Sequence, residues 1–407
     1  MDAITATIRE MYTHFPYPDG APMLRQGGDA RLLLSLARRG RPAGAAIRLL
    51  DAGCGRGVGL IAGAALQPDV DFLGVDICAR SLDAAREQAR RRNLNNVRFQ
   101  ELDLMTLEGL DAPGDGFDVI LSSGVLHHLA DPLTGLRRLR EHLAPHGVLS
   151  LMVYGRHGRE SLYRVVRAID ALVPRSAPLA ERLAVGRQLV ASFPCEAFRA
   201  GPWSDHAEIG DAEFVDRYLN VHETSYDVPE LFALIASAGL EFLRWCEPAD
   251  WDVESLLPPG ELRERALTLA PLERWRLLDA MFWRPGLEVL LCQAGNGPRD
   301  PLDIGHAESE PLCLSPEASL HFERRNLRGL QRNESLRVRV RRREPIDVGV
   351  GPLAQALLLL EDQLEPFLFG DFVRALAERG VGPQAARAAI LELLRSDVLY
   401  RPHQADL

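Results

Sequence analysis

A glycine-rich turn carries the strongest chemical signal in this sequence. An apolar run over 47–50 ends at an acid, and three glycines then follow at every second position, in the order Asp51-Ala52-Gly53-Cys54-Gly55-Arg56-Gly57. Helical spacing of apolar residues resumes at Val58, so the stretch predicts a buried strand, a tight turn and the start of a helix. Glycine lets the backbone bend sharply and approach a ligand without a Cβ in the way. The helix start adds backbone N–H groups beside that ligand.

The residues of the turn leave more than one interpretation open. A dinucleotide site with G-x-G-x-x-G spacing matches Gly53 and Gly55 but would need glycine where Val58 stands. A phosphate-binding P-loop would need Gly-Lys-Ser/Thr, which does not follow. A nucleoside cofactor site and a purely structural strand-to-helix turn both remain, and the surrounding chain must decide between them.

A second acid stands at the end of the next predicted strand. Asp76 closes the strand 71–76. An ionised carboxylate only accepts hydrogen bonds and can take two hydroxyl donors, and in Rossmann-like folds an acid at this place binds ribose hydroxyls. The alternative is that Asp76 only caps the following helix.

A further polar stretch follows the fourth predicted strand, 117–121. It reads Ser122-Ser123-Gly124-Val125-Leu126-His127-His128-Leu129-Ala130-Asp131-Pro132. With the glycine turn, it carries a family resemblance. Asp-x-Gly-x-Gly-x-Gly resembles motif I of class I S-adenosylmethionine-dependent methyltransferases, and 117–132 is similar to the motif IV region of their small-molecule type.

The resemblance covers 47–154 and implies S-adenosyl-L-methionine as the cofactor and S-adenosyl-L-homocysteine as its product. It implies that Asp103, after the strand 97–102, bonds the exocyclic amine of adenine, that Leu102 or Leu104 contacts the adenine ring, and that His127 and His128 lie beside the sulfonium. The cofactor-binding candidates are Asp51, Ala52, Gly53, Cys54, Gly55, Asp76, Ile77, Asp103, Leu104, Ser122, His127 and Tyr12.

Methyl transfer from a sulfonium is an in-line displacement. The protein must exclude water, align the nucleophile with the methyl group and, where needed, remove a proton. The candidates for this catalytic role are His127, His128, His222 and Tyr226. The alternative for the histidine pair is a structural or cofactor contact, and for the other two a polar surface position. An amine acceptor would need no dedicated base, and without a dense ligand cluster of the H-E-x-x-H type we predict no metal.

Short apolar runs alternate with helical stretches from 47 to 154, which is typical of βαβ units. We predict an α/β fold, a Rossmann-like seven-stranded class I methyltransferase sheet with helical insertions, plus a small α+β winged-helix-like C-terminal domain. The seven predicted strands are 47–51, 71–76, 97–102, 117–121, 148–154, 241–246 and 287–293.

The predicted domains follow the chain in order. They are N-terminal helices and a cofactor-covering strap at 1–46, the cofactor-binding core at 47–154, a substrate lid at 155–225, the end of the methyltransferase fold at 226–293 with a helical insertion at 250–284, a linker at 294–316 and the accessory domain at 317–407. The lid prediction rests on irregularly spaced aromatic and polar residues, among them Phe193, Phe198, Trp203, His206 and Tyr218. An insertion after the fifth strand starts at the carboxyl edge of the sheet, where ligands bind in such folds. A structural insertion with its own small core is the alternative.

The amino-acid composition restricts the classes of function and partner that are possible. The 407 residues are 46% hydrophobic and 26% charged, as in ordinary globular proteins, and the net charge of −10 does not favour nucleic acid or membrane surfaces. The chain contains no lysine, which excludes Schiff-base chemistry on a lysine. Its six cysteines form no C-x-x-C pair, which together with the absence of an apolar signal segment predicts a cytoplasmic protein.

The predicted function is methyl transfer to an O, N or C nucleophile of a small metabolite or natural-product intermediate. One alternative is a peptide or protein acceptor, held by the nine arginines within 321–343. A catalytically silent cofactor-binding regulatory module is the other. No nucleic-acid or membrane partner is predicted, and a homodimer through the C-terminal domain is the remaining partner prediction.

Overall fold

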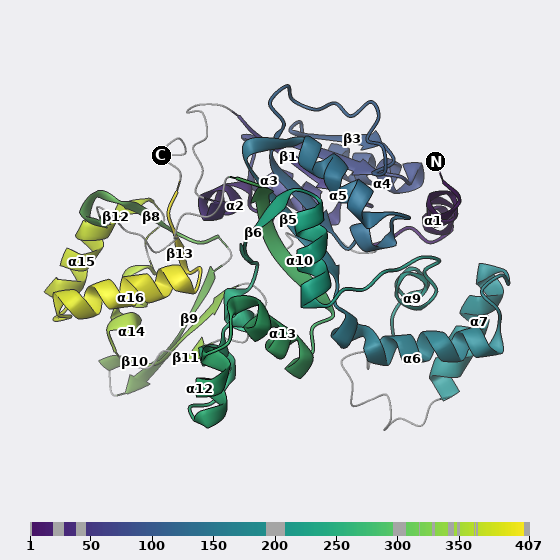
Figure 1. The fold of residues 1–407 in the computed structure, drawn as a ribbon. Coiled ribbons are helices and arrows are strands. Elements are labelled where there is room, and N and C mark those ends of the chain that lie inside the picture. The colour runs from purple at the N-terminus through teal and green to yellow at the C-terminus, as the bar shows by residue number, and fades with distance from the viewer. Residues whose placement is uncertain are drawn as a thin grey trace. The chain divides into compact units, whose positions relative to one another are not determined.

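The computed structural model describes residues 2–18, 28–37, 46–192, 208–295, 307–316, 318–327, 330–340, 346–347, 351–361, 363 and 365–402. The chain forms two compact units (Figure 1). The first contains Met1–Leu24 and Ala46–Gly297, and the second contains Arg25–Ala45 and Pro298–Leu407. The second unit is therefore assembled from two separate stretches of sequence.

The first unit is built on a seven-stranded sheet in the order β3-β2-β1-β4-β5-β7-β6. Strand β7 runs antiparallel to both of its neighbours, and the other neighbouring pairs are parallel. All seven predicted strands are confirmed, with ends shifted by a few residues. They are β1 (Ile47–Ala52), β2 (Val70–Asp76), β3 (Val97–Glu101), β4 (Phe117–Ser123), β5 (Leu143–Tyr154), β6 (Leu240–Trp245) and β7 (Gly286–Gln293).

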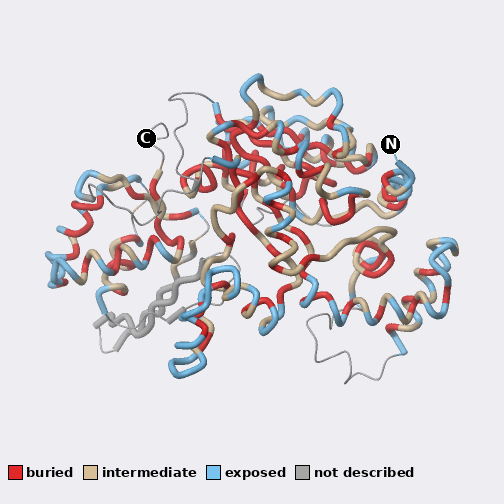
Figure 2. Tube along the Cα trace, viewed as in Figure 1, coloured by how far each residue is buried: buried red, intermediate tan, exposed pale blue. Residues whose placement is uncertain are grey.

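Helices connect the strands and bury apolar residues of the sheet. The central strands are buried along most of their length (Figure 2), as expected for a parallel sheet covered on both faces. These connecting helices are α3 (Val58–Leu66), α4 (Ala79–Arg91), η1 (Leu126–His128), α5 (Pro132–Glu141) and α10 (Val228–Ser237). The start of α10 is a capping box, in which the side chains of Asp227 and Glu230 each accept a hydrogen bond from the backbone N–H of the other.

A group of helices in the first unit has a hydrophobic cluster of its own. It contains α1 (Ala3–His14), α6 (Arg156–Leu172), α7 (Leu179–Ser192) and α9 (Asp211–Tyr218). Leu162, Val165 and Ile169 place one face of α6 against Phe214 and Tyr218 of α9. Figure 1 shows α6, α7 and α9 together in teal. The predicted lid residues Phe193, Phe198, Trp203 and His206 lie outside the described residues.

The predicted insertion at 250–284 packs into the main core. Its elements are η2 (Pro248–Trp251), α11 (Val253–Leu256), α12 (Glu261–Leu267) and α13 (Pro271–Met281). Trp251 stacks on Trp245 of β6 with ring centroids 3.7 Å apart, and Trp275 lies against Phe232 of α10. These aromatic residues therefore extend the core.

The second unit contains two small sheets and several helices. Its elements are α2 (Ala30–Ala37), η3 (Ala307–Ser309), β8 (Pro311–Leu314), β9 (Ala318–Leu327), β10 (Leu330–Val340), β11 (Ile346–Asp347), α14 (Pro352–Leu359), β12 (Phe367–Leu368), α15 (Phe369–Glu378), α16 (Pro383–Arg395) and β13 (Leu399–Tyr400). The strand orders are β12-β8-β13 and β11-β10-β9. Three helices on a small sheet are compatible with the predicted winged-helix-like module.

Two boundaries differ from the sequence-based expectation. The structure places α2 in the second unit, where the Ser35 hydroxyl donates to the carbonyl of Arg401 at 2.6 Å, whereas the sequence assigned it to the N-terminal segment. Strand β8 lies inside the expected linker and is the middle strand of its sheet. Both elements contact partners that lie far away in the sequence, which local patterns do not record.

Candidate active site

The predicted cofactor residues lie at one edge of the sheet. Asp51 and Ala52 end β1, Asp76 ends β2, and Ser122 is near the end of β4. Asp103 follows β3, and these four strands are adjacent and parallel. Their carboxyl ends therefore meet, and the fold brings together residues that are up to 71 positions apart, from Asp51 to Ser122.

The backbone N–H groups of the glycine turn are used within the protein. Those of Gly53 and Cys54 both donate to the carbonyl of Val75, at 2.8 and 3.0 Å. Gly55 donates to the Asp76 carboxylate at 2.8 Å and Gly57 to the carbonyl of Cys54 at 2.9 Å. A phosphate-binding loop needs such N–H groups to point at the ligand. The geometry therefore fits a cofactor without a pyrophosphate.

The glycines are required by the packing of the turn as well as by its backbone. Gly53 has φ +89°, and a Cβ there would lie 2.4 Å from Cγ2 of Val125. Gly55 has φ +53°, and its Cβ would lie 2.6 Å from the carbonyl oxygen of Tyr17. The N-terminal segment thus lies directly against the turn.

Asp76 holds the turn together. One carboxylate oxygen accepts from the N–H of Gly55 and the other from that of Cys78 at 2.9 Å. Burial raises the pKa of Asp76, while the bonds from Cys78 and Gly55 lower it. Each carboxylate oxygen has a second lone pair, so the predicted ribose contact and the alternative helix-capping contact are compatible.

The other cofactor candidates differ in accessibility. Asp103 is half-buried and accepts from the N–H of Met105 at 2.9 Å. Leu104 is packed in the main core, whereas Leu102 is only partly buried. Of the two residues predicted to contact adenine, Leu102 has the more open side chain. Ile77 is half-buried, and Cys54 is buried with its thiol pKa raised by burial and by the nearby acids Asp51 and Asp76.

The Tyr12 hydroxyl bonds to α9 and the segment after it. It donates to Asp216 of α9 at 2.7 Å and accepts from the side-chain amide of Asn220 at 3.3 Å. The structure thus joins Tyr12 to the inserted helices, and the predicted contact of Tyr12 with the cofactor stays a prediction. The neighbouring Thr13 keeps the end of α1 near the β2–α4 turn, because its carbonyl accepts from the Arg80 side chain at 2.8 Å.

His127 and His128 are buried, and each has an unpaired ring nitrogen. His127 accepts at Nδ1 from the backbone N–H of Tyr154 at 3.2 Å, so the proton of its neutral ring is on Nε2. His128 donates from Nδ1 to the carbonyl of His222 at 2.9 Å, so its Nε2 carries a lone pair. Both Nε2 atoms and the Ser122 hydroxyl lack a partner within the described residues. Buried polar atoms of this kind call for a ligand or water.

Burial keeps both imidazoles neutral. It lowers the pKa of His127 well below its ordinary value, and the neighbouring His128 and Arg159 act in the same direction. It lowers the pKa of His128 to about 4, against the opposing effect of Glu223. The pair therefore presents one N–H donor and one nitrogen acceptor at neutral pH.

The remaining two catalytic candidates are placed differently. His222 is partly exposed and donates from Nδ1 to the carbonyl of His128 at 3.2 Å, so the structure brings it to the pair. The Tyr226 backbone N–H donates to the carbonyl of Tyr154, but the Tyr226 side chain packs in the main core. Burial and the charges of Glu230 and Asp131 raise the pKa of Tyr226 to about 12. This environment does not favour a proton-transfer role for Tyr226.

Tyr154, at the end of β5, forms the wall beside the histidines. Its ring stacks on His127 with centroids 3.6 Å apart, and the Arg159 guanidinium lies 3.5 Å from the same ring centroid. Two planar groups this close to one centroid must occupy opposite faces. Arg159 also makes a bidentate pair with Glu223, at 3.0 and 2.8 Å, and Glu223 accepts from the Tyr163 hydroxyl at 2.5 Å.

Tyr154, Arg159 and Asp216 were not among the sequence-based site candidates. A usable signal existed for the two charged residues. Arg159 precedes Leu162, Val165 and Ile169 on the buried face of α6, and Asp216 is flanked by the buried Val215 and Tyr218 on α9. Charged residues at core positions are rare and are usually paired or functional.

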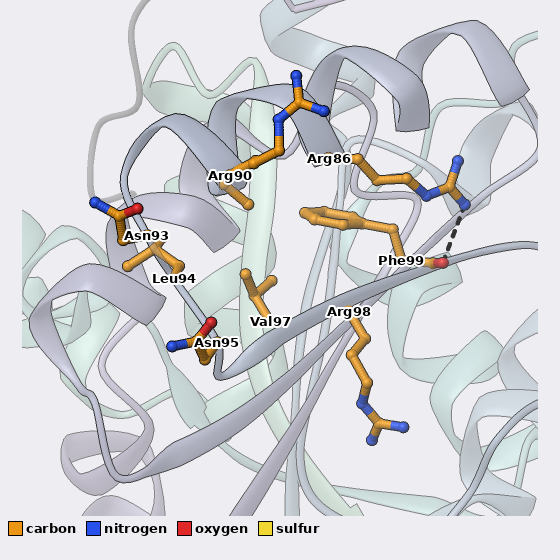
Figure 3. Close-up of a pocket in the computed structure, with 9 residues that line it drawn as sticks. Arg86, Arg90, Asn93, Leu94, Asn95, Val97, Arg98 and Phe99 are labelled. Atoms are coloured by element: carbon orange, nitrogen blue, oxygen red, sulfur yellow. Dashed lines mark hydrogen bonds between the residues drawn. The ribbon is translucent and has the colours of Figure 1, made fainter.

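A cavity of about 590 Å³ lies elsewhere in the first unit, along α4 and β3 (Figure 3). Arg86 donates to the carbonyl of Phe99 at 3.1 Å, across one side of this cavity. Its three arginines, Arg86, Arg90 and Arg98, pair with acids at the surface. The residues at the carboxyl edge of the sheet do not line it, so we do not assign methyl transfer to this cavity.

Among the described residues, no group of three or more His, Cys, Asp or Glu side chains is arranged to hold a metal ion. None of the described helices is long and apolar enough to cross a membrane. Cys54, Cys78 and Cys313 are free thiols.

Three features define a Rossmann-like methyltransferase fold. They are the strand order, the antiparallel strand β7, and a glycine turn whose backbone N–H groups are bonded within the protein. A family model described as a methyltransferase domain matches residues 50–149. The chain belongs to the class I S-adenosylmethionine-dependent methyltransferases, so it is an enzyme of EC 2.1.1 type that uses S-adenosyl-L-methionine. The residues present fit this cofactor, since the turn offers no phosphate cradle and Ser122, His127 and His128 have unpaired polar atoms beside it.

Related proteins share different parts of the chain. An uncharacterized protein of Synechococcus sp., syc1184_c, is 31% identical over 298 residues, which are 69% of either chain. A ubiquinone biosynthesis O-methyltransferase of Cereibacter sphaeroides is 34% identical over 122 residues, 30% of this chain and 47% of that one. This chain thus spans about half the length of that relative.

One solved structure resembles nearly the whole chain. PKMT2 from Rickettsia typhi in complex with AdoHcy aligns with 96% of this chain and 78% of its own, with a TM-score of 0.70 and 16% sequence identity. At this identity the likeness shows a shared fold.

Proposed function

We propose that this enzyme transfers a methyl group to a nucleophile of a small molecule held beside His127 and His128. The carrying observation is the pair of buried, unpaired Nε2 atoms next to the cofactor residues of β4. One is a donor and the other an acceptor. A polar group of an acceptor molecule placed between them would satisfy both atoms.

The cofactor, when bound, supplies a methyl group already activated by a positively charged sulfur. The residues of the chain therefore have to align and shield the reactants. The His128 Nε2 accepts a hydrogen bond from the attacking O–H or N–H, and the His127 N–H fixes a second polar atom. With a pKa of about 4, His128 orients the nucleophile but does not retain its proton at neutral pH.

The lid assignment is part of this proposal. The segment that follows β5 supplies Arg159 and Glu223, which fix the Tyr154 ring beside His127. This arrangement supports an acceptor site bounded by the 155–225 insertion. The curated relatives that carry small-molecule names, an O-methyltransferase of ubiquinone biosynthesis and a trans-aconitate 2-methyltransferase of Deinococcus radiodurans, support the same class of acceptor.

Transfer of labelled methyl groups tests the proposal. Full-length enzyme and radiolabelled S-adenosyl-L-methionine are added to a cell extract separated into small molecules and proteins. We expect label in the small-molecule fraction and its loss when both histidines are replaced, His127→Ala with His128→Ala. Label confined to proteins would instead identify a peptide or protein acceptor. Label in neither fraction, despite measured cofactor binding, would contradict the proposal.

A further inference from the structure

Asp216 is a buried carboxylate without an ion pair. Its side chain lies on α9 with 6% of the residue exposed, and one oxygen accepts from the Tyr12 hydroxyl at 2.7 Å. Within the described part of the chain it makes no other hydrogen bond and no salt bridge. Buried carboxylates are normally paired with a cation or several donors, because removing the charge from water is costly.

The nearby cations are committed to other acids. Arg159 of α6 makes its bidentate pair with Glu223, and Arg217 of α9 pairs with Glu213 at 2.7 Å. These two arginines lower the pKa of Asp216, as does the Tyr12 bond, but burial and the charge of Glu213 raise it to about 6. At neutral pH the site therefore carries a negative charge that no described side chain neutralises by contact.

Asp216 is connected to the reaction site by hydrogen bonds. Tyr12 donates to Asp216 at 2.7 Å and accepts from the Asn220 side chain at 3.3 Å, and the side-chain oxygen of Asn220 accepts from the backbone N–H of His222 at 3.3 Å. His222 in turn bonds to His128 at 3.2 Å. Burial and the charge of Asp216 raise the pKa of Tyr154. Tyr154 stacks on His127, whose Nε2 is one of the unpaired buried atoms. The half-buried Tyr154 makes no side-chain hydrogen bond with another described residue, so its hydroxyl is free to accept one.

We infer that the acceptor is an amine, and that Asp216 with the hydroxyls of Tyr12 and Tyr154 binds its ammonium form. This inference rests on the proposed function and names the substrate class of the same site. A carboxylate and two hydroxyl oxygens match the three N–H donors of a primary ammonium. An alcohol or a carbon nucleophile would leave the carboxylate uncompensated.

The chemical step is balanced with these groups alone. The bound ammonium gives one proton to the Asp216 carboxylate and becomes a neutral amine, which turns one of its two remaining N–H groups to the His128 Nε2 and its lone pair to the methyl group. The N–C bond then forms as the C–S bond breaks, and the electron pair of that bond goes to sulfur. The product leaves as a methylated ammonium, and Asp216 returns its proton to the solvent.

An amine of this kind has two sources, a free small molecule or the side chain of a lysine in another protein. The sequence makes the two separable, because the chain itself contains no lysine. Label found in this chain cannot lie on a lysine of its own. Label on a lysine must therefore belong to a second protein.

Binding without turnover is the first test. Phenethylamine hydrochloride and 2-phenylethanol are matched probes, and each is titrated at pH 7 into the full chain with S-adenosyl-L-homocysteine present, with thermal stability as the readout. We expect at least tenfold tighter binding of the amine, loss of that preference in Asp216→Asn, and retention in the matched control Asp211→Asn on the exposed side of α9. Equal binding of the two probes, or of neither, overturns the inference, as does an unchanged preference in Asp216→Asn.

Affinity for the cofactor product separates this assignment from binding of the cofactor's own amino group. We expect S-adenosyl-L-homocysteine to bind Asp216→Asn within twofold of the wild-type affinity. A tenfold loss would place the cofactor's ammonium at Asp216 and overturn the inference.

Chemical blocking of amines is the second test. The small-molecule and protein fractions are treated with N-hydroxysuccinimide acetate before the labelling reaction. We expect at least tenfold less label in whichever fraction accepted it. Undiminished label after acylation overturns the amine assignment but leaves methyl transfer in place, whereas absence of label from both untreated fractions contradicts the proposed function itself.

Discussion

The rings of His128 and His222 are joined by reciprocal hydrogen bonds to each other's backbone. Each Nδ1 lies near the carbonyl oxygen of the other residue, at 2.9 Å from His128 and 3.2 Å from His222. A carbonyl only accepts, so both Nδ1 atoms carry protons and both Nε2 atoms carry lone pairs when the rings are neutral. The contact joins the turn after β4 to the segment before α10 and fixes which nitrogen of His128 faces its ligand.

This relationship gives a test of the His128 side chain. Asparagine places its amide N–H near the Nδ1 position but has no group at Nε2. We expect His128→Asn to keep the fold and the cofactor Kd while kcat/KM falls about tenfold, the scale of one lost hydrogen bond. Steady-state kinetics with cofactor calorimetry measures this. Unchanged kinetics would show that the His128 ring is structural.

The buried histidine and the buried acid give opposite dependences of stability on pH. The pKa of His128 is lowered from 6.5 to about 4, so in that range the unfolded chain binds the extra proton and stability is lost as the pH falls. The pKa of Asp216 is raised from 3.8 to about 6, so the folded chain binds the extra proton and stability is lost as the pH rises through 6. The two contributions oppose each other between pH 4 and 6.

Replacing His128 or Asp216 should therefore change how the free energy of unfolding depends on pH, in opposite directions. Relative to wild type, the free energy of unfolding of His128→Asn should fall as the pH rises from 4 to 6, by about 1 kcal/mol per pH unit. That of Asp216→Asn should rise over the same range. Urea unfolding at several pH values measures both slopes, and parallel curves for all three proteins would contradict the assigned shifts.

Replacing only one member of the Arg159–Glu223 ion pair should strongly lower the stability of the fold. Arg159 is 2% exposed, and Glu223→Gln would leave its charge without a compensating carboxylate. We expect a loss of about 3 kcal/mol in the free energy of unfolding, and a smaller loss in the double variant Arg159→Met, Glu223→Gln, because neither member of this pair then stays buried as a charge without its partner. The exposed pair of Arg265 and Glu261 is the control, and Glu261→Gln should change stability by less than about 0.5 kcal/mol. Equal losses in the single and double variants would contradict the account.

Asp76 should contribute both to the stability of the fold and to the affinity for S-adenosyl-L-homocysteine. Asp76→Ala removes the acceptor for the N–H groups of Gly55 and Cys78. We expect the free energy of unfolding to fall by about 1–3 kcal/mol, the range for leaving buried donors unpaired, together with weaker binding of S-adenosyl-L-homocysteine. Denaturant titration and calorimetry separate the two effects. Loss of stability with an unchanged Kd would leave Asp76 as a structural residue only.

The assignment of α2 to the second unit predicts how truncations behave. Leu32, Leu33 and Leu34 of α2 are buried, so deleting 298–407 while keeping α2 should expose them and cause association on size-exclusion chromatography. Deleting 25–45 as well, with a Gly-Ser linker in place, should restore a monodisperse protein that binds S-adenosyl-L-homocysteine like the full chain. A monodisperse first variant would contradict the assignment. The full chain, run alongside, tests the predicted homodimer.

The sequence was sufficient for features that depend on neighbouring residues. Periodicity predicted the first five strands of the first sheet, the family resemblance led to the last two, and the Asp51–Gly57 spacing predicted the strand, turn and helix of the cofactor motif. The acids Asp76 and Asp103 were predicted at strand ends, and parallel strands put such ends at one edge. Periodicity and turn residues act locally, so they are visible in a short window of sequence.

Tertiary structure alone decided which distant groups meet. It joined Tyr12 to Asp216, 204 positions away, and Ser35 to Arg401, 366 positions away. It also placed Tyr226 in the core while tying His222 to His128, although both stand in the same short polar segment. The physical reason is that burial, a charge without a counter-ion and the proton position on an imidazole depend on contacts across the fold. Local sequence fixes the elements that carry these residues but not the neighbours they meet.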